Sequence, residues 1–338
     1  MKNTLINVCH KAGIHRLLTP LYGGHTSILL LHRVTPEPQR GLPTDALAVS
    51  PEFLERFIRE KQATGWRFVS MDHIVDHFDE CVARKLNMAV TLDDGYRDNL
   101  EHAKPVFDKL GIPYTIYVAN SFPDGTADLW WYTLVDLLER HRCLDINHCG
   151  VRLILSIDKP KQALNAFKAF YEALGIVEQR DFMARLTARY PLSADNRIVW
   201  LAWDEIRELA SDNLCTIGCH TFNHLSLGSL GREEALDEMR RSKDEIELRI
   251  GRPVRHLAYP YGKKPDASDR EASLAAETGF RSAVTTRIGN LFAAHRDHLL
   301  MLPRIPLYEV GKNGRLSEIF LSGMYTAVTH GLKRVVTD

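Results

Sequence analysis

The sequence predicts an α/β protein in which parallel strands close into a barrel with helices outside. Short apolar strands alternate with helices over much of the 338 residues, which is the pattern of a parallel sheet. Polar motifs directly follow several strands, at Asp93-Asp94, His220 and Tyr259-Pro260-Tyr261. In βα barrels the carboxyl ends of the strands carry the active-site loops. Because packing does not explain polar residues at one end of several strands, a barrel is favoured over an open doubly wound sheet.

The first part of the chain gives four strands separated by helices. Residues 1–27 form a polar leader with some helical tendency, and Ile28 begins an apolar run typical of a strand buried on both faces. Ser50 is suited to cap a helix that starts at Pro51. Gly111 is suited to end a helix over Arg97–Leu110. The predicted strands are Ile28–Leu31, Trp66–Val69, Met88–Leu92 and Tyr114–Ala119, with another helix from about Asp72.

The regular alternation stops near residue 122 and resumes after residue 200. We therefore expect a barrel over 28–310 that is interrupted by a mainly helical insertion at about 125–200, with one β-like run at Val151–Ile157. A helical tail is expected at 311–338. The later predicted elements are helices from Trp203, over Arg232–Ile250 and over Ser268–Glu277, and strands at Leu214–Cys219, His256–Tyr259 and Phe280–Thr285.

The composition excludes several classes of protein. Hydrophobic residues make up 45% and charged residues 25%, as in ordinary globular proteins. Basic and acidic residues balance at 43 each, so no global field recruits nucleic acid or an anionic membrane. No secretory signal or membrane-length apolar run is seen, so a cytoplasmic protein is expected. The six cysteines form no CxxC pair and are expected to be mostly reduced and buried.

Two motifs carry the chemistry of a metal-assisted hydrolase. The adjacent carboxylates Asp93 and Asp94 repel each other, so both stay ionised only beside a cation or strong donors. His220 and His224 are four residues apart, and on a helical turn both can face one ion. A surface turn and a pair of capping histidines are the alternatives. Together the motifs offer three ligands and a base.

A third motif, Tyr259-Pro260-Tyr261-Gly262, follows the strand predicted at 256–259. Proline restricts the backbone and glycine allows a tight turn. A backbone N–H held in this way, such as that of Tyr261, can donate to a developing oxyanion. The alternative is an ordinary turn at the end of a strand.

In this order, the motifs resemble those of the polysaccharide deacetylases, carbohydrate esterase family four with the NodB-homology domain, over roughly 28–125 and 200–306. The family pattern Thr-Phe-Asp-Asp-Gly appears as Thr91–Gly95, and His-[Ser/Thr]-x-x-His appears as His220–His224. The resemblance implies a deformed (β/α)7 barrel. It also implies Asp93 as catalytic base, with Asp94, His220 and His224 holding a divalent metal. Zinc is our first choice, with cobalt or nickel as alternatives.

The sequence departs from the family pattern in two places. The arginine of the family's Arg-x-Pro-Tyr motif is replaced by Ala258, and Arg304, after a late strand, is a candidate to orient the base instead. The late leucine-histidine motif that supplies a general acid is not evident, since His295 and His298 lie in a predicted loop. His32 is the candidate acid because Leu31–Val34 resembles the Tyr-His-x-Val start of exopolysaccharide deacetylases, although a lone histidine is often structural.

The expected function is metal-dependent removal of an N-acetyl group from an amino sugar of a polysaccharide, oligosaccharide or glycan precursor. Asp93 takes a proton from the attacking water, and His32 protonates the leaving amine. The Tyr261 N–H stabilises the oxyanion, and Arg304 orients the base. Trp130 and Trp131 can stack on sugar rings or belong to a core. An amidase of the same fold acting on a small non-sugar amide, and a non-catalytic glycan-binding homologue, are the alternatives.

Overall fold

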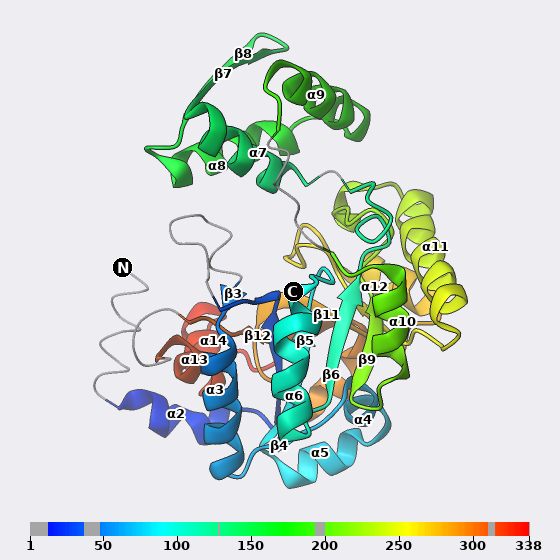
Figure 1. The fold of residues 1–338 in the computed structure, drawn as a ribbon. Coiled ribbons are helices and arrows are strands. Elements are labelled where there is room, and N and C mark those ends of the chain that lie inside the picture. Colours follow the sequence, from blue (N-terminus) through cyan, green and yellow to red (C-terminus); the bar gives the residue numbers. More distant parts are fainter. Residues whose placement is uncertain (1–12, 37–47, 128, 193–199, 310–314, 338) are drawn as a thin grey trace. The chain divides into compact units, whose positions relative to one another are not determined.

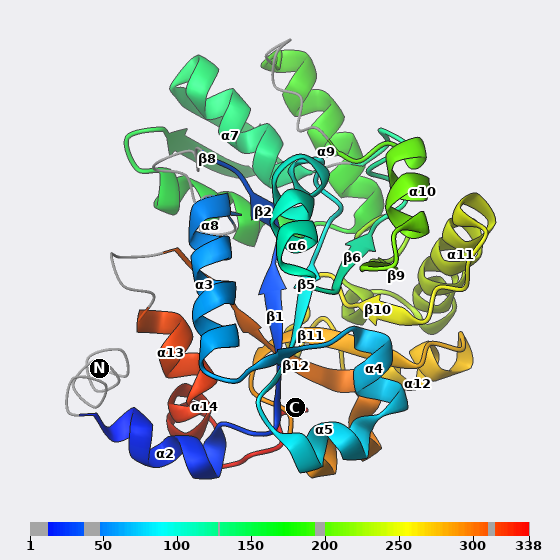
Figure 2. The same ribbon diagram turned by 60° about the horizontal axis from the view of Figure 1, so that its bottom comes forward.

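The chain forms two compact units in a computed structural model that describes residues 13–36, 48–127, 129–192, 200–309 and 315–337. The first, here called the barrel unit, comprises residues 1–37, 47–125 and 200–338. The second, here called the inserted unit, comprises the described residues between 126 and 199. Figures 1 and 2 show the elements of each unit.

Seven parallel strands close the barrel unit into a ring. The sheet runs in the order β1, β12, β11, β10, β9, β6, β5, and pairing of β1 with β5 completes it. A short strand, β4 (Arg67–Phe68), pairs with the first two residues of β5. The prediction of a deformed seven-stranded barrel is therefore confirmed. The ring strands are β1 (Thr26–Leu31), β5 (Asn87–Leu92), β6 (Tyr114–Val118), β9 (Cys215–Cys219), β10 (His256–Ala258), β11 (Ser282–Ile288) and β12 (Leu302–Pro306).

Apolar side chains from six of these strands fill the inside of the barrel. Every residue of β1, β5, β6 and β12 is buried, as expected for parallel strands covered on both faces. Tyr117 is the largest member of the interior cluster, and its neighbour across the sheet is Gly218. A Cβ at Gly218 would lie 2.4 Å from Cδ1 of Tyr117, so this strand position has room only for glycine. The strand residues of the cluster are Ile28, Ala89, Tyr117, Ala258, Val284 and Leu302.

Helices surround the strands, as Figure 2 shows. Ser50 caps α3 by accepting a hydrogen bond from the Phe53 N–H at 3.2 Å, as its sequence predicts. Gly111 ends α6 in the left-handed region at φ 64°. None of the described helices combines the length and apolar character needed to cross a membrane. The α-helices of this unit are α2 (Ile14–Tyr22), α3 (Pro51–Ala63), α4 (Met71–Asp76), α5 (Phe78–Arg84), α6 (Lys104–Leu110), α10 (Trp203–Ser211), α11 (Arg232–Ile250), α12 (Asp269–Glu277), α13 (Arg315–Leu321) and α14 (Met324–Thr329).

Short elements complete the barrel unit. The helix predicted over Arg97–Leu110 begins as a π-helical stretch, η2 (Asn99–Ala103), that leads into α6. Two two-residue strands, β2 (Arg33–Val34) and β3 (Ala48–Val49), pair with each other. The 3₁₀ segments are η3 (Leu227–Ser229) and η4 (Ala293–Met301).

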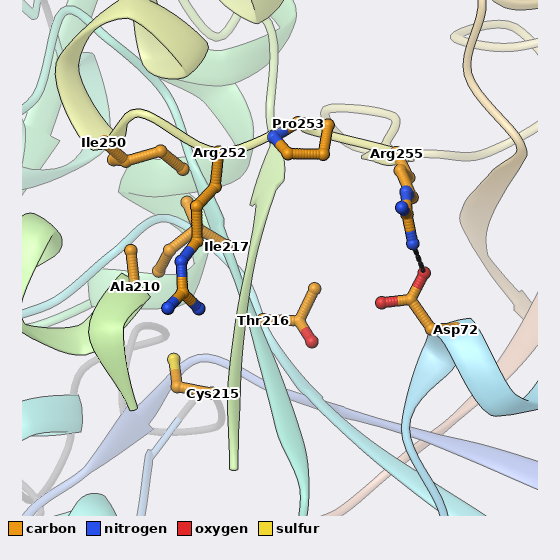
Figure 3. A pocket seen from close by; sticks show the side chains of 9 residues that line it. All are labelled: Asp72, Ala210, Cys215, Thr216, Ile217, Ile250, Arg252, Pro253 and Arg255. Atoms are coloured by element: carbon orange, nitrogen blue, oxygen red, sulfur yellow. Dashed lines mark hydrogen bonds and ion pairs between the residues drawn. The ribbon is translucent and has the colours of Figure 1, made fainter. Parts of the chain in front are cut away.

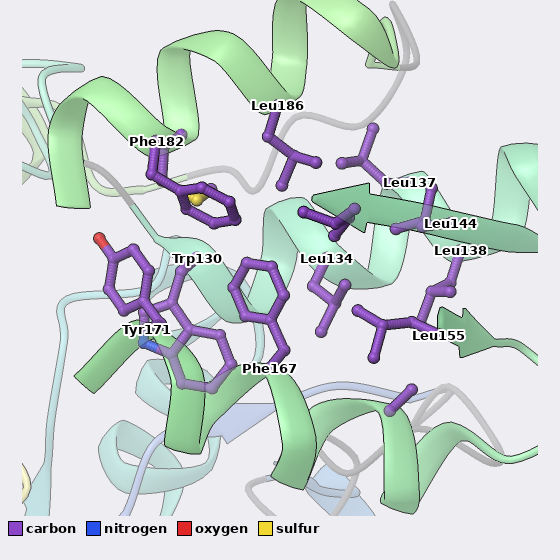
Figure 4. Close-up of a cluster of buried hydrophobic side chains, with 13 residues drawn as sticks. Trp130, Leu134, Leu137, Leu138, Leu144, Leu155, Phe167, Tyr171, Phe182 and Leu186 are labelled. Atoms are coloured by element: carbon purple, nitrogen blue, oxygen red, sulfur yellow. The ribbon is translucent and has the colours of Figure 1, made fainter. Parts of the chain in front are cut away.

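The inserted unit has its own hydrophobic core, drawn in Figure 4. It contains a strand that the sequence did not predict, β7, because Asp145, Asn147 and His148 interrupt its apolar pattern. Trp130 is 6% exposed and stacks on Phe167 with ring centroids 5.7 Å apart, so it belongs to this core. The elements are α7 (Trp130–His141), β7 (Cys143–His148), β8 (Val151–Ser156), α8 (Pro160–Glu172) and α9 (Ile176–Arg189).

The described cysteines differ in exposure. Cys81, Cys215 and Cys219 are free and buried, as expected. Cys143 and Cys149 are free but exposed, so the expectation of buried cysteines is wrong for this pair. Cys143 begins β7, and Cys149 lies in the turn to β8.

Candidate metal centre

Asp94, His220 and His224 converge at the carboxyl ends of two barrel strands. Asp94 follows β5, and His220 follows β9. The Nε2 atoms of both histidines lie 3.3 Å from Oδ1 of Asp94. One ligand atom from each residue lies within 4.8 Å of the other two, and all three side chains are buried. Within the described ranges, no other group of three such residues gathers in this way.

The histidine motif forms a loop and not the helical turn that its spacing predicted. Residues 220–224 have no helical assignment, and Thr221 and His224 adopt φ values of 64° and 56°. Asp94 also has a positive φ, 76°. Such angles are uncommon and strained for non-glycine residues, and they cluster where function requires them. The two backbone reversals let both imidazoles face one point, which explains why the spacing alone misjudged the local structure.

Hydrogen bonding leaves these residues suited to hold a divalent cation. The Nδ1 atom of His220 lies 2.7 Å from the carbonyl oxygen of Ala258. Since a carbonyl only accepts, Nδ1 carries a proton, and in the neutral imidazole Nε2 has the lone pair that faces Asp94. Oδ1 of Asp94 is buried without a hydrogen-bond partner. One carboxylate oxygen and two imidazole nitrogens are ligands that zinc, cobalt or nickel accept, so the residues present fit the expected ion.

The short distances between Asp94 and the two histidines shift the pKa values of Asp94 and His220. Burial works against ionisation of Asp94, but the neighbouring His220 and His224 outweigh it and hold the pKa of Asp94 well below its ordinary value. Burial also works against protonation of His220, but Asp94 outweighs it and raises the pKa of His220. In the absence of a cation, a proton is therefore the competitor for this position.

Asp93 is held by Arg304, which reaches it from β12. Nη1 donates to Oδ1 at 2.7 Å and Nη2 donates to Oδ2 at 2.6 Å. Arg304 also donates from Nε to the Thr285 carbonyl at 2.8 Å and from Nη1 to the Thr91 hydroxyl at 3.1 Å. Burial opposes ionisation of Asp93, but the guanidinium outweighs it and lowers the pKa of Asp93. Arg304 thus occupies the place beside Asp93 that the sequence assigned to it.

His32 lies beside the same carboxylates. It follows β1, and the carbonyl of the preceding Leu31 accepts a hydrogen bond from the Asp93 N–H at 3.0 Å. Burial lowers the pKa of His32, while the charges of Asp94 and Asp93 oppose that shift. His32 is therefore the histidine that β1 brings to the site.

Tyr261 contacts the second histidine of the pair. Its ring centroid is 5.2 Å from that of His224, and its φ is 61°. The hydroxyl of Thr286 donates to the Tyr261 carbonyl. Gly262 is required next to it, because a Cβ there would lie 2.6 Å from the backbone nitrogen of Thr286. The turn that carries Tyr261 is therefore closely held against β11.

His295 is brought to the other end of the barrel. Leu291 bridges to Thr26, the first residue of β1, and η4, which contains His295, follows it. Burial lowers the pKa of His295 to about 4. It does not join Asp93 and Asp94, which follow the carboxyl end of β5.

An aromatic group that the sequence did not single out adjoins the site within the barrel unit. The ring centroid of Phe122 lies 5.4 Å from that of His224 and 4.2 Å from that of Trp200. Trp200 lies 4.5 Å from Tyr96. Trp200 is partly exposed, whereas Phe122 and Tyr96 are buried. Isolated aromatic residues outside the motifs give no sequence signal, so only the fold reveals this group.

A separate cavity lies at the amino end of β9 and β10, with a volume of about 210 Å³ (Figure 3). Cys215 begins β9 and lines this cavity, whereas His220 follows the end of the strand. A strand of this length spans roughly 17 Å, so the cavity is not the metal-ligand site. Its lining residues are Asp72, Ala210, Cys215, Thr216, Ile217, Ile250, Arg252, Pro253 and Arg255.

Solved structures with a similar fold are deacetylases. A deacetylase from Streptococcus pyogenes, PplD, solved in complex with acetate, is 17% identical, with a TM-score of 0.57 over 87% of this chain and 97% of that one. A polysaccharide deacetylase from Bacillus cereus, BC0361, is 17% identical, with a TM-score of 0.55 over 87% and 68%. IcaB from Ammonifex degensii is 16% identical, with a TM-score of 0.53 over 88% and 96%. These similarities show a shared fold.

The family of the chain follows from a second comparison. No curated protein matches the sequence. The family model described as polysaccharide deacetylase matches residues 82–283, which include both metal-ligand motifs. This span covers more than half of the chain, and we conclude that the chain belongs to the polysaccharide deacetylase family.

Proposed function

We propose that this protein is a metal-dependent hydrolase that removes the N-acetyl group from an amino sugar of a polysaccharide, oligosaccharide or glycan precursor. The observation that carries the proposal is the pairing of a buried, arginine-held carboxylate, Asp93, with the adjacent Asp94–His220–His224 group. A base beside a three-ligand metal site is the equipment for amide hydrolysis.

Asp94, His220 and His224 would hold the ion, with zinc as first choice and cobalt or nickel as alternatives. When bound, such an ion supplies a Lewis acid for the carbonyl and favours ionisation of water. Asp93 accepts the proton of the attacking water. Because Arg304 lowers the pKa of Asp93, the carboxylate is ionised at neutral pH and available as a base.

The remaining steps are assigned to His32 and to the backbone of Tyr261. In this proposal His32 protonates the leaving amine, since it follows Leu31, whose carbonyl accepts from the Asp93 N–H. The charges of Asp94 and Asp93 favour its protonated form, against the effect of burial on its pKa. The backbone N–H of Tyr261 donates to the oxyanion that forms from the acetyl oxygen. The positive φ of Tyr261 and its closely held turn support a fixed donor at this position.

The aromatic group beside His224 supports a sugar as substrate. Apolar ring faces stack on the faces of pyranose rings. Trp200 is partly exposed and contacts Phe122, whose ring in turn contacts His224. Trp130, considered for this role from the sequence, is instead core of the inserted unit. We therefore assign the stacking role to Trp200.

The non-catalytic alternative rested on the alanine at position 258 and on the missing late leucine-histidine motif, for which His32 is the proposed substitute. Arg304 provides a guanidinium to Asp93 from another strand, which removes this reason to doubt the base. An amidase of the same fold acting on a small non-sugar amide stays the second candidate, because the metal group alone does not distinguish the two substrates. The cytoplasmic location stays a prediction from the sequence.

Acetate release from N-acetylglucosamine oligomers tests the proposal. Wild type loaded with zinc, cobalt or nickel is expected to release acetate, and Asp93→Asn at equal metal content is expected to lose the activity by at least about 100-fold. Equal rates for the two proteins would remove Asp93 as base. Activity only on small non-sugar amides would favour the second candidate, and no hydrolysis of either class under any metal would favour the non-catalytic one.

A further inference from the structure

We infer that Glu238, on the long helix α11, is a positioning residue that holds the loop between the two histidine ligands in its binding conformation. The inference rests on the proposed metal site and assigns it a residue outside the sequence motifs. Glu238 lies 14 positions after His224 along the chain, as the seventh residue of α11. Figures 1 and 2 show this helix among those of the barrel unit.

Glu238 binds the loop at two consecutive residues. Its Oε2 accepts a hydrogen bond from the backbone N–H of Asn223 at 2.8 Å, and its Oε1 accepts one from Nδ2 of Asn223 at 2.5 Å. Its backbone carbonyl accepts a hydrogen bond from the N–H of Phe222 at 3.1 Å. The backbone N–H groups of Phe222 and Asn223, in the middle of the loop, therefore both donate hydrogen bonds to Glu238.

The burial of Glu238 makes these contacts strong. The residue is 7% exposed, and hydrogen bonds to an ionised carboxylate are shorter and stronger than bonds between neutral groups. A buried carboxylate is costly unless its oxygens are satisfied. Here both oxygens are satisfied by Asn223, so the carboxylate and the loop depend on each other.

The loop needs such a restraint because its backbone is strained on both sides of Asn223. Thr221 and His224 hold φ values of 64° and 56°, which side-chain-bearing residues adopt only when their surroundings impose them. A relaxed φ at His224 would redirect its imidazole away from Asp94. The restraint on Asn223 therefore acts through the backbone on the position of Nε2 of His224.

The same face of α11 also holds the strand that leads into the loop. Ser242 lies one helical turn after Glu238, and residues four apart share a helix face. Its hydroxyl accepts a hydrogen bond from Sγ of Cys219 at 3.0 Å and donates one to Oδ1 of Asn120 at 2.6 Å. Cys219 directly precedes His220. Glu238 and Ser242 thus connect one helix to the ligand loop and to the end of the strand that precedes it.

A purely structural contact between a helix and a loop would change stability but not the metal site. Glu238→Gln separates the two, since the substituted side chain keeps its size but replaces one acceptor oxygen with a donor that faces Nδ2 of Asn223. We expect zinc affinity, measured by competition with a chelator, to fall about 10- to 100-fold. The absorption bands of the cobalt-loaded protein should change in intensity, which reports altered ligand geometry. Asp244→Asn, an exposed carboxylate on the same helix, is the matched control and should leave both readouts unchanged.

A second change restores the contact with the roles of the partners exchanged. In Glu238→Gln combined with Asn223→Asp, the amide donates to the new carboxylate and its oxygen still accepts from the backbone N–H of residue 223. Recovery of most of the zinc affinity is expected. Unchanged affinity and cobalt spectrum in folded Glu238→Gln would overturn the inference, as would loss of affinity that the double change fails to restore. Failure of wild type to bind zinc, cobalt or nickel would instead overturn the proposed function.

Discussion

Arg304 and Asp93 form a two-bond ion pair inside the barrel, with N–O distances of 2.7 and 2.6 Å and exposures of 0% and 2%. The two residues come from β12 and the end of β5, which are separated in the ring by β1. The pair therefore connects the two strands that flank β1 and holds the proposed base. Breaking a buried pair leaves an uncompensated charge, so both stability and protonation of Asp93 depend on it.

Arg304→Lys should move the acidic limb of the pH–activity profile. Arg304 lowers the pKa of Asp93, so the ionised base persists toward low pH. A lysine cannot form two parallel hydrogen bonds, which raises the pKa of Asp93 and moves the limb of kcat/KM upward by about one pH unit. Arg281→Lys is the control, because Arg281 also pairs with a carboxylate, Asp76, but at an exposed position. If the acidic limb of the pH–activity profile does not move in Arg304→Lys, Arg304 does not control the protonation of the base.

Zinc affinity should fall as the pH decreases through the raised pKa of His220. Below that pKa the metal-free protein carries a proton on His220, held by Asp94, and zinc must displace it. The loss should begin above the ordinary value of 6.5 and reach about tenfold per pH unit. Chelator competition at a series of pH values measures it. Histidine side chains titrate within about pH 5–8. A zinc affinity that does not change between about pH 6 and 8 would contradict this account.

Gly218→Ala should destabilise the barrel by about 1–3 kcal/mol, as overpacking does. The added Cβ would lie 2.4 Å from Cδ1 of Tyr117, and the Tyr117 ring centroid lies 6.0 Å from Arg304 Cζ. Denaturant unfolding measures the change. Gly175→Ala is the control, because the nearest atom to its added Cβ is a side-chain oxygen 3.9 Å away. Equal stability of Gly218→Ala and wild type would show that the interior has unexpected room.

Trp200→Ala should raise KM for N-acetylglucosamine oligomers about 2- to 10-fold with little change in kcat, since stacking is a binding term. Trp200→Phe keeps an aromatic face and should retain most of the affinity. The two substitutions are compared by steady-state acetate release. Equal KM values for wild type and Trp200→Ala would remove this ring from the substrate site.

The sequence predicted those features that depend on local patterns. Continuous apolar runs predicted the strands, and polar motifs at their ends predicted the proposed metal ligands and Asp93. Arg304 was proposed although it lies 211 positions from Asp93, because it was expected to follow a late strand; it lies within β12 instead. The strand predicted at Phe280–Thr285 instead runs from Ser282 to Ile288, since polar Thr286 and Arg287 hide its end.

Other features depend on contacts that a single sequence does not reveal. The loop conformation of 220–224 is imposed by partners on α11, so the spacing of the histidines predicted the wrong backbone. Glu238 is one of many charged residues on α11, and nothing in its neighbours distinguishes a buried glutamate from an exposed one. The interrupted apolar pattern of β7 likewise becomes a strand only through pairing with β8.

The central claim is that Asp94, His220 and His224 hold one metal ion. Anomalous diffraction at the zinc absorption edge, from crystals of protein loaded with zinc, tests it most directly. The account predicts a peak within bonding distance, about 2.0–2.2 Å, of the Asp94 carboxylate and of Nε2 in both histidines. Zinc bound elsewhere in the protein, with no peak between these three side chains, would contradict it.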